Sequence, residues 1–407
     1  MKHLIPVVLL TAIATTVIGC QAQSSSQIQS GAQSQAAANA PTLQALKQIA
    51  VGKTPHGMTA ASGFVYNSNQ GSASISVIDP ATDTVVKEIP VADGTPGYTK
   101  AFHDGKHVLT LDRKNGNLLV IDPAKEHQVI QTIAVGQGPD RIIIDEDDKN
   151  VMVALTDESK LIQLTFEGDR AKAPARKELA VGSVAPAQSK HRSIDFKQGW
   201  TVSPNSGENN VSLLNLVAGT TQTVTAGNSP GPVGIGTDSD QAVAAMVGNV
   251  ASNTLTLFAL PSFEATTLSD VGLSPTEMTF DSQLGRAYVT MAGSNDVAVV
   301  DYKAKKLVGR VPVGRRPVHI FMAPPMPTSG KYAIARSGST STQLSREIWV
   351  GNDDGESVTI FDGDTLRVKA TVMTGKGHHK MAFVGTKAYI SNLIDGTVSV
   401  IDRTAIK

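Results

Sequence analysis

One short phrase recurs eight times along the chain and constrains its fold more than any other feature. The phrase is Val or a small residue, Gly, two variable residues and, in most copies, Pro, followed by an alternating apolar run. Its copies begin at residues 51, 91, 135, 181, 225, 271, 313 and 374, and the fourth and fifth are degraded. Successive copies therefore start 40 to 61 residues apart. A repeat of this length indicates one supersecondary unit per copy.

Each unit is predicted to be a meander of four short strands. The first copy contains the runs HGMTAA, FVYNSN, ASISVID and TVVKEIPV, which are separated by Gly, Asn, Asp and Pro residues typical of turns. Such four-stranded units form the blades of a β-propeller. We therefore expect an all-β domain over residues 42–407 with eight four-stranded blades. Seven blades remain the alternative if the degraded fourth copy is not a full blade.

The sequence also predicts how the ring closes. The eighth copy ends after three strands, at VSVIDRTAIK, whereas residues 42–51 resemble the fourth strand of the other copies. We expect residues 42–51 to pair beside residues 397–402 and to complete the last blade. This pairing would leave no open sheet edge.

Three segments carry a resemblance to a known family. They are Tyr288-Val289-Thr290, Tyr389-Ile390-Ser391-Asn392 and the strand Val398–Asp402. In these the chain resembles the YVTN family of β-propellers, although Asp395-Gly396-Thr397 stands where the family often has an Asn-rich turn. The resemblance covers about residues 42–407 and implies the propeller fold. It implies no single activity, because members of one fold family have many roles.

The first 41 residues predict export and anchoring. Residues 1–19 have a polar start and an apolar core too short for a comfortable membrane span, as in a signal peptide. Val17-Ile18-Gly19-Cys20 resembles a bacterial lipobox, which implies cleavage before Cys20 and acylation of that residue; an ordinary signal peptide is the alternative. Gln21 after the cysteine implies the outer membrane, on its periplasmic side or at the cell surface. Residues 20–41 carry no charge and are expected to be a flexible tether.

Composition argues against several classes of function. Cys20 is the only cysteine, so the propeller has no disulfide, no thiolate metal site and no covalent haem attachment. Of the 36 Lys and Arg residues only Lys2 precedes residue 42, while all 36 acidic residues follow it. The domain is therefore nearly neutral and lacks the basic excess of a nucleic-acid-binding protein.

The recurring phrases are expected to meet at one mouth of the central channel, where their next residues point inward. The ligand-binding candidates at these positions are Tyr98, Lys100, Asp140, Arg141, His191, Arg192 and Glu277. The metal-binding candidates are His56, His319 and His379, on three consecutive blades, with His378 as an alternative ligand. Neutral imidazoles suit zinc or copper, with Glu277 or water completing the shell. The histidines could instead serve packing and hydrogen bonding, or hold an organic or tetrapyrrole ligand.

Three functions remain open from the sequence. The first is a lipid-anchored, non-enzymatic scaffold whose funnel binds a metal ion, a small ligand or a protein partner. The second is a haem- or cofactor-handling protein, since the blade count and funnel histidines resemble the propeller domain of haem-containing nitrite reductases and their maturation proteins, in which a histidine is the axial ligand. The third is a structural envelope protein. An insertion near residues 326–346 is expected on the face opposite the histidines.

Overall fold

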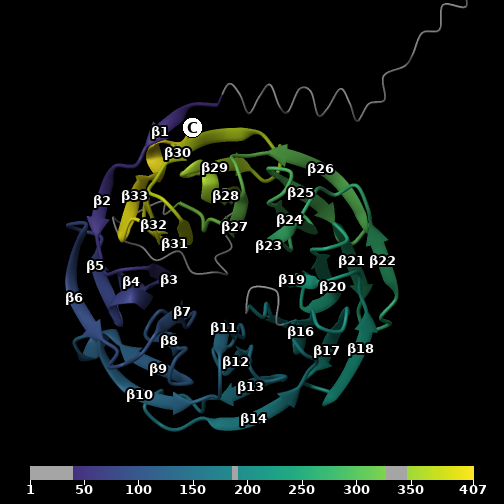
Figure 1. The fold of residues 1–407 in the computed structure, drawn as a ribbon, viewed down its shortest axis with the longest axis horizontal. Coiled ribbons are helices and arrows are strands. Elements are labelled where there is room, and N and C mark those ends of the chain that lie inside the picture. The colour runs from purple at the N-terminus through teal and green to yellow at the C-terminus, as the bar shows by residue number, and fades with distance from the viewer. Residues whose placement is uncertain (1–39, 186–190, 327–345) are drawn as a thin grey trace, which may run out of the picture.

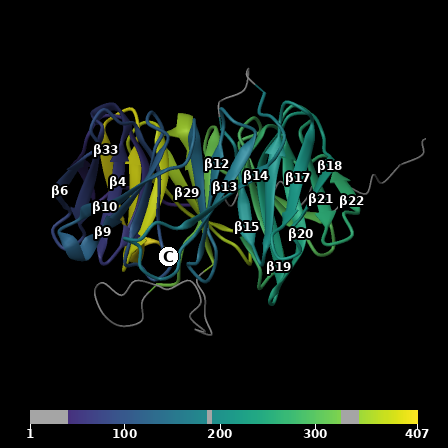
Figure 2. The same cartoon turned by 90° about the horizontal axis from the view of Figure 1, so that it is seen from below.

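The computed structural model describes residues 40–185, 191–326 and 346–407. In this part of the chain, eight blades, each of four antiparallel strands, stand in a ring around a central channel, and one further strand joins the sheet of the seventh blade (Figure 1). Seen from the side, the molecule is a flattened disc (Figure 2). The prediction of an all-β propeller with eight blades is confirmed. The seven-bladed alternative is wrong, because the degraded fourth copy forms a complete blade, β15 to β18.

The strands of the blades fall into four classes by their distance from the channel. The innermost strands are β3 (Pro55–Ala61), β7 (Pro96–Ala101), β11 (Pro139–Ile144), β15 (Asp195–Lys197), β19 (Pro230–Asp238), β23 (Pro275–Asp281), β27 (Pro317–Met322) and β31 (His378–Val384). The second strands are β4 (Phe64–Asn69), β8 (Val108–Asp112), β12 (Asn150–Leu155), β16 (Trp200–Asn205), β20 (Gln241–Asn249), β24 (Arg286–Met291), β28 (Glu347–Asn352) and β32 (Lys387–Asn392).

The third strands are β5 (Ser74–Asp79), β9 (Asn117–Asp122), β13 (Lys160–Thr165), β17 (Asn210–Asn215), β21 (Thr254–Ala259), β25 (Asp296–Asp301), β29 (Ser357–Asp362) and β33 (Thr397–Asp402). The outer strands are β6 (Thr84–Pro90), β10 (Gln128–Ala134), β14 (Ala175–Ala180), β18 (Thr220–Thr225), β22 (Ala265–Leu268), β26 (Lys306–Pro312), β30 (Val368–Met373) and, in the eighth blade, β2 (Lys47–Ala50). Short 3₁₀ turns lie at η1 (Gln70–Ser72), η2 (Pro123–Lys125), η3 (Asp353–Gly355) and η4 (Arg403–Ala405).

The apolar core lies between neighbouring blades. Leu111 of β8 and Val153 of β12 belong to one buried cluster, in which the rings of Phe102 and Phe166 meet edge to face at 5.7 Å. The third strand β9 and the second strand β12 are buried on both faces, and their sequences are nearly continuous apolar runs. Apolar packing between the blades therefore supplies the main adhesion of the ring.

The N-terminal segment closes the ring, with one correction to the predicted strand. β2 pairs antiparallel with β33, with Ile49 opposite Val398. The predicted single strand 42–51 is wrong in its first half, because β1 (Thr42–Gln44) pairs in parallel with β30 of the seventh blade. Between β1 and β2, the Ala45 N–H donates to Met373 and the Leu46 N–H to Val400, so the chain crosses from one blade to the next.

A repeated asparagine explains the glycine of the recurring phrase. Asn249 ends the second strand of its blade, and its side chain donates to Thr254 and Thr256, five and seven residues further on. Gly227 packs directly on this side chain, where a Cβ would lie 2.7 Å from Asn249 Cγ. The same asparagine contacts recur at Asn69, Asn205, Asn352 and Asn392. Glycine is therefore required where the phrase crosses the asparagine.

The proline of the phrase is followed by a bulge that turns side chains toward the channel. The register between the first two strands shifts between Pro275 and Met278, between Pro317 and His319, and between His378 and Met381. A bulge leaves residues outside the regular ladder and redirects their side chains. These bulges place the candidate residues at one end of the channel.

Two of the predictions concern residues outside the described part of the chain. One is the lipidation of Cys20, and the other concerns the insertion, of which residues 327–345 are not described. Among the residues that are described, no helix is long and apolar enough to cross a membrane.

Candidate functional site

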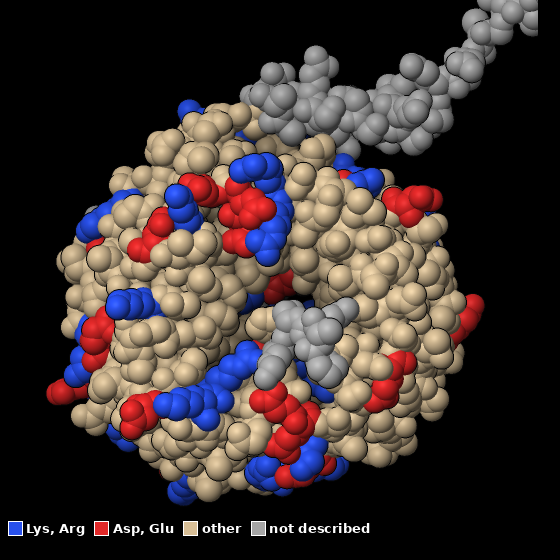
Figure 3. All heavy atoms as spheres, in the orientation of Figure 1, with Lys and Arg blue, Asp and Glu red and all other residues tan. Residues whose placement is uncertain are grey.

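A cavity of about 650 Å³ opens at one mouth of the channel. Figure 3 shows a hollow at the centre of this face, with acidic and basic side chains visible inside it. Nine predicted site residues line the cavity: His56, Tyr98, Asp140, Arg141, His191, Glu277, His319, His378 and His379. Lys100 and Arg192 are not among the lining residues. The recurring phrases and the turns after the second strands therefore form one mouth, as the sequence predicts.

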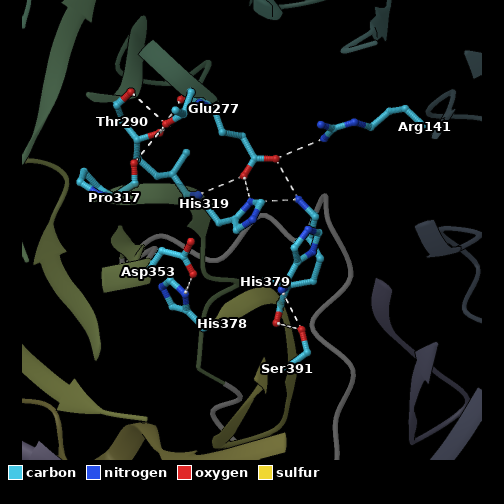
Figure 4. Close-up of polar contacts among 12 residues, drawn as sticks. Arg141, Glu277, Thr290, Pro317, His319, Asp353, His378, His379 and Ser391 are labelled. Atoms are coloured by element: carbon cyan, nitrogen blue, oxygen red, sulfur yellow. Dashed lines mark hydrogen bonds and ion pairs between the residues drawn. The ribbon is translucent and has the colours of Figure 1, made fainter. Parts of the chain in front are cut away.

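Glu277 is the hub of a charged network that spans the channel (Figure 4). Its carboxylate accepts hydrogen bonds from Arg141 Nη1 at 3.2 Å, Lys380 Nζ at 2.9 Å and His319 Nδ1 at 3.0 Å. Glu277 belongs to the sixth blade. Its partners Arg141, His319 and Lys380 belong to the third, seventh and eighth blades. Burial opposes ionisation of the carboxyl, but Lys380, His319 and Arg141 outweigh it and hold the pKa of Glu277 well below its usual range. We call Tyr98, Arg141, Glu277, His319 and Lys380 the central cluster.

Tyr98 completes the central cluster on the side of the second blade. Its ring centroid lies 5.1 Å from the guanidinium of Arg141 and 5.5 Å from Lys380 Nζ, which is cation–π geometry. Burial alone would raise the pKa of the phenol, but Arg141, Lys380 and Lys100 lower it below its usual value. No hydrogen bond joins its hydroxyl to another described residue.

Asp140 is the second buried carboxylate of the mouth. It accepts from Arg113 Nη1 at 2.8 Å, His191 Nδ1 at 2.8 Å and the Arg192 N–H at 2.9 Å. The guanidinium of Arg192 points into the wall instead, where it donates to the carbonyls of Leu155 and Gly182. Arg192 therefore ties the third and fourth blades together rather than facing the cavity.

Three histidines stack in a row at the mouth. The ring centroids of His56 and His379 are 3.9 Å apart, and those of His379 and His319 are 4.5 Å apart. Burial, with Lys380 nearby, lowers the pKa of His56 to about 3 and that of His319 to about 4, and burial with the neighbouring histidines holds the pKa of His379 well below its usual value. The histidine row is therefore neutral at neutral pH.

The hydrogen bonds of these rings fix which nitrogen carries the proton. An ionised carboxylate only accepts, so His319 donates from Nδ1 to Glu277 and His191 donates from Nδ1 to Asp140. His379 Nδ1 likewise donates to the carbonyl of His56 at 3.1 Å. In the described part of the chain the Nε2 atoms of these three rings have no hydrogen-bond partner. Each ring therefore keeps an unshared lone pair.

His378 lies apart from the histidine row. It occupies the position of the phrase's proline and packs on Gly351, where a Cβ would lie 2.2 Å from His378 Nε2. Its Nδ1 is 3.7 Å from Asp353 Oδ1, longer than a hydrogen bond, and neither ring nitrogen is hydrogen-bonded to a described residue.

The predicted metal site stays a prediction. Among the described residues, no group of three or more His, Cys, Asp or Glu side chains is arranged to hold a metal ion.

Three features of the mouth were not among the predicted site residues. Lys380 belongs to the central cluster and occupies the bulge position two residues after His378, as Glu277 does after Pro275, so the alignment of the copies could have found it. Arg113 directly follows the second strand of its blade, and Arg316 is a variable residue of the seventh phrase, so the repeat does not single out either one. Apolar side chains also line the mouth: Pro230, Pro232, Val250, Ala292, Leu393 and Ile394.

No protein-family model and no curated protein matches the chain. Solved structures are similar to it in fold. The dihydro-haem d1 dehydrogenase NirN in complex with DHE has a TM-score of 0.55 at 17% identity, over 79% of this chain and 67% of that one. Hydrazine synthase of Kuenenia stuttgartiensis has a TM-score of 0.54 at 18% identity, over 87% and 96%. Sqt1 of Saccharomyces cerevisiae has a TM-score of 0.66 at 10% identity, over 89% and 99%. At these identities the likeness shows the β-propeller fold alone.

Proposed function

We propose that this protein is a lipid-anchored, extracytoplasmic binding protein of a bacterial envelope, whose channel mouth holds a small organic ligand without transforming it. The observation that carries the proposal is the central cluster beneath a cavity of about 650 Å³. That volume lies in the range of small-molecule sites, which combine apolar walls with a few fixed polar groups.

The central cluster is difficult to explain as a structural device. The blades adhere through apolar clusters between their sheets, so the ring does not need charges in its channel. Burying ion pairs is often no more stabilising than apolar packing of the same volume. The side chain of Lys380 is only 6% exposed, and its desolvation opposes folding. Recognition of a ligand gives these charges a role that folding does not.

A transition-metal ion is the second candidate ligand. Metal-binding histidines usually donate one ring N–H to a carboxylate or carbonyl and present the other nitrogen to the metal. His191, His319 and His379 have this pattern. Zinc or copper would be held through Nε2 of His319 and His379, with a ring nitrogen of His56 as a third ligand, after small movements of the stacked rings.

A tetrapyrrole or other cofactor is a special case of the organic ligand. The NirN structure, similar in fold, contains DHE. A neutral imidazole with a free Nε2 is the type of group that ligates haem iron. Cofactor handling therefore stays an alternative within the same site.

Analysis of the protein purified from its native envelope tests the proposal. Native mass spectrometry should find one bound small molecule per chain, and the absorption spectrum and metal content should assign it to the organic, metal or tetrapyrrole class. The membrane fraction should contain the acylated chain. Protein isolated repeatedly without any bound molecule, from cells grown in rich medium, would contradict the proposal.

A further inference from the structure

The central cluster has a surplus of positive charge, and apolar side chains line part of the same mouth. Both features bear on the nature of the ligand. Resting on the proposed function, we infer that the ligand is an organic anion with an apolar body, whose charged group binds against Lys380 and Arg141.

The charge surplus follows from the contacts of the channel wall. In the central cluster, one carboxylate, Glu277, is shared by two cations, Arg141 and Lys380, while the histidine row adds no charge. The second buried carboxylate of the mouth, Asp140, is matched by Arg113. The guanidinium of Arg192 points into the wall, where it donates to neutral oxygens and lies within the electrostatic influence of Glu208. At the exposed rim, Arg316 pairs with two carboxylates, Asp353 and Asp354, so the positive surplus is confined to the central cluster. A buried surplus of positive charge is unfavourable until an anion joins it.

The central cluster also has donor capacity for such an anion. Lys380 has three N–H donors, and its contacts with described groups are to Glu277 and, at 3.4 Å, to the protonated Nδ1 of His319. Arg141 and Lys380 lie near the ring of Tyr98, whose hydroxyl has no hydrogen-bond partner among the described residues. A carboxylate or sulfonate in the cavity would accept from both groups.

The apolar side chains of the mouth specify the body of the ligand. The fifth blade contributes Pro230, Pro232 and Val250 to the cavity, and its phrase is the only described one with no polar side chain after the proline. Leu393 and Ile394 of the eighth blade, which also carries Lys380, add further apolar side chains to the mouth, and Ile394 is 70% exposed. Burial of an apolar body on these side chains would add affinity in proportion to the area covered.

Calorimetry with three probes of one shape tests the charge. The probes are 2-naphthoate, 2-naphthalenemethanol and 2-naphthylmethylammonium, each titrated into the full-length processed protein. The carboxylate should bind at least about tenfold more tightly than the alcohol, and the ammonium should bind weakest.

Two variants with opposite effects locate the charged group. Lys380→Met should weaken naphthoate binding about tenfold and leave the alcohol within about threefold, whereas Glu277→Gln should strengthen naphthoate binding because it enlarges the positive surplus. Lys380→Arg should preserve the preference. Lys303→Met is the matched control, since it removes an exposed cation that is paired with Asp238 and does not line the cavity. If Lys380→Met does not fold, Glu277→Gln and Lys380→Arg still show whether the site prefers a negatively charged ligand.

The outcomes separate this inference from the proposed function. Equal binding of the alcohol and the carboxylate, tighter binding of the ammonium, or no binding of any probe would overturn the inference. So would a Glu277→Gln variant with weaker naphthoate binding. A neutral or cationic molecule in the protein from the native envelope would also overturn it, while leaving the proposed function intact.

Discussion

Arg141 and Glu277 meet across the channel, with 3.2 Å between Nη1 and Oε1, although they lie 136 residues apart and belong to the third and sixth blades. Lys380 of the eighth blade joins the same carboxylate oxygen at 2.9 Å. The channel is therefore crossed by a charged network at the base of its mouth. The blades fix the positions of these side chains, and the cavity above them is where a ligand would bind.

Truncation at the N-terminus should separate the roles of β1 and β2. A chain lacking residues 1–46 loses only β1, whose residues are mostly exposed, and should lose little stability. A chain lacking residues 1–51 also loses β2 and the buried Ile49, which leaves β33 as an unpaired edge. Urea unfolding should show a large loss of stability for the longer truncation alone. Equal stabilities of the two truncated chains would contradict the closure of the eighth blade by β2.

The buried histidines should make the protein sensitive to acid. His319 has a pKa of about 4 when folded and about 6.5 when unfolded, so between these values the unfolded chain binds more protons. Its contribution to stability is therefore fully present above about pH 6.5 and is lost as the pH falls toward 4. Glu277 remains ionised in this window because its pKa lies well below its usual range. For this one histidine, the free energy of unfolding should fall by about 2 kcal/mol from pH 7 to pH 5.

Urea unfolding of His319→Gln at pH 7 and pH 5 measures the contribution of this histidine. The decrease in the free energy of unfolding between the two pH values should be smaller in the variant than in the wild type by about 2 kcal/mol. Gln222→Ala, which changes an exposed side chain that does not titrate, is the control and should keep the wild-type fall. An unchanged fall in His319→Gln would mean that this imidazole is not buried in its neutral form.

The histidine row should account for any binding of zinc or copper. Replacing His56, His319 and His379 together by Ala should abolish binding in calorimetry while the fold is kept, because the blades are held by their apolar clusters. Since the pKa of His56 is about 3 and that of His319 about 4, binding should persist below the pH at which free imidazole becomes protonated. Absence of binding by the intact protein, or equal binding by the triple variant, would leave these residues a structural role.

Anchoring should depend on Cys20. The variant Cys20→Ser removes the residue that the lipobox-like sequence would present for acylation. It should appear as soluble protein or as an uncleaved precursor, and it should take up no fatty-acid label in cells. Label retained by the variant would contradict lipidation at this residue.

The fold was predictable because each blade repeats its own local signals. Turn residues, apolar runs and the spacing of the phrase recur in nearly every copy, so eight blades could be inferred even with the fourth copy degraded. The split of residues 42–51 into two strands was not predictable, because the crossing at Ala45 and Leu46 depends on backbone contacts with Met373 and Val400. A local sequence pattern does not predict contacts between residues that are far apart in the sequence.

The candidate site was predictable in place but not in its contacts. The bulge after the proline repeats, so His56, Glu277, His319 and His379 could be assigned to the mouth. Which side chain meets which depends on the lengths and charges that converge from distant blades. Thus Lys380 reaches Glu277 across 103 residues, whereas Arg192, expected in the cavity, turns into the wall toward carbonyl oxygens.

The central claim is that the channel mouth holds a small ligand, and filling the mouth tests it most directly. Ala292 lines the cavity and is half-buried, so Ala292→Trp should occupy part of the cavity without removing a polar group. Ala304→Trp, at an exposed turn between β25 and β26, is the matched control. Native mass spectrometry of the three proteins purified from the native envelope should show a bound small molecule in the wild type and in Ala304→Trp and none in Ala292→Trp. Equal retention of the molecule by both variants, or its absence from the wild type, would contradict the account.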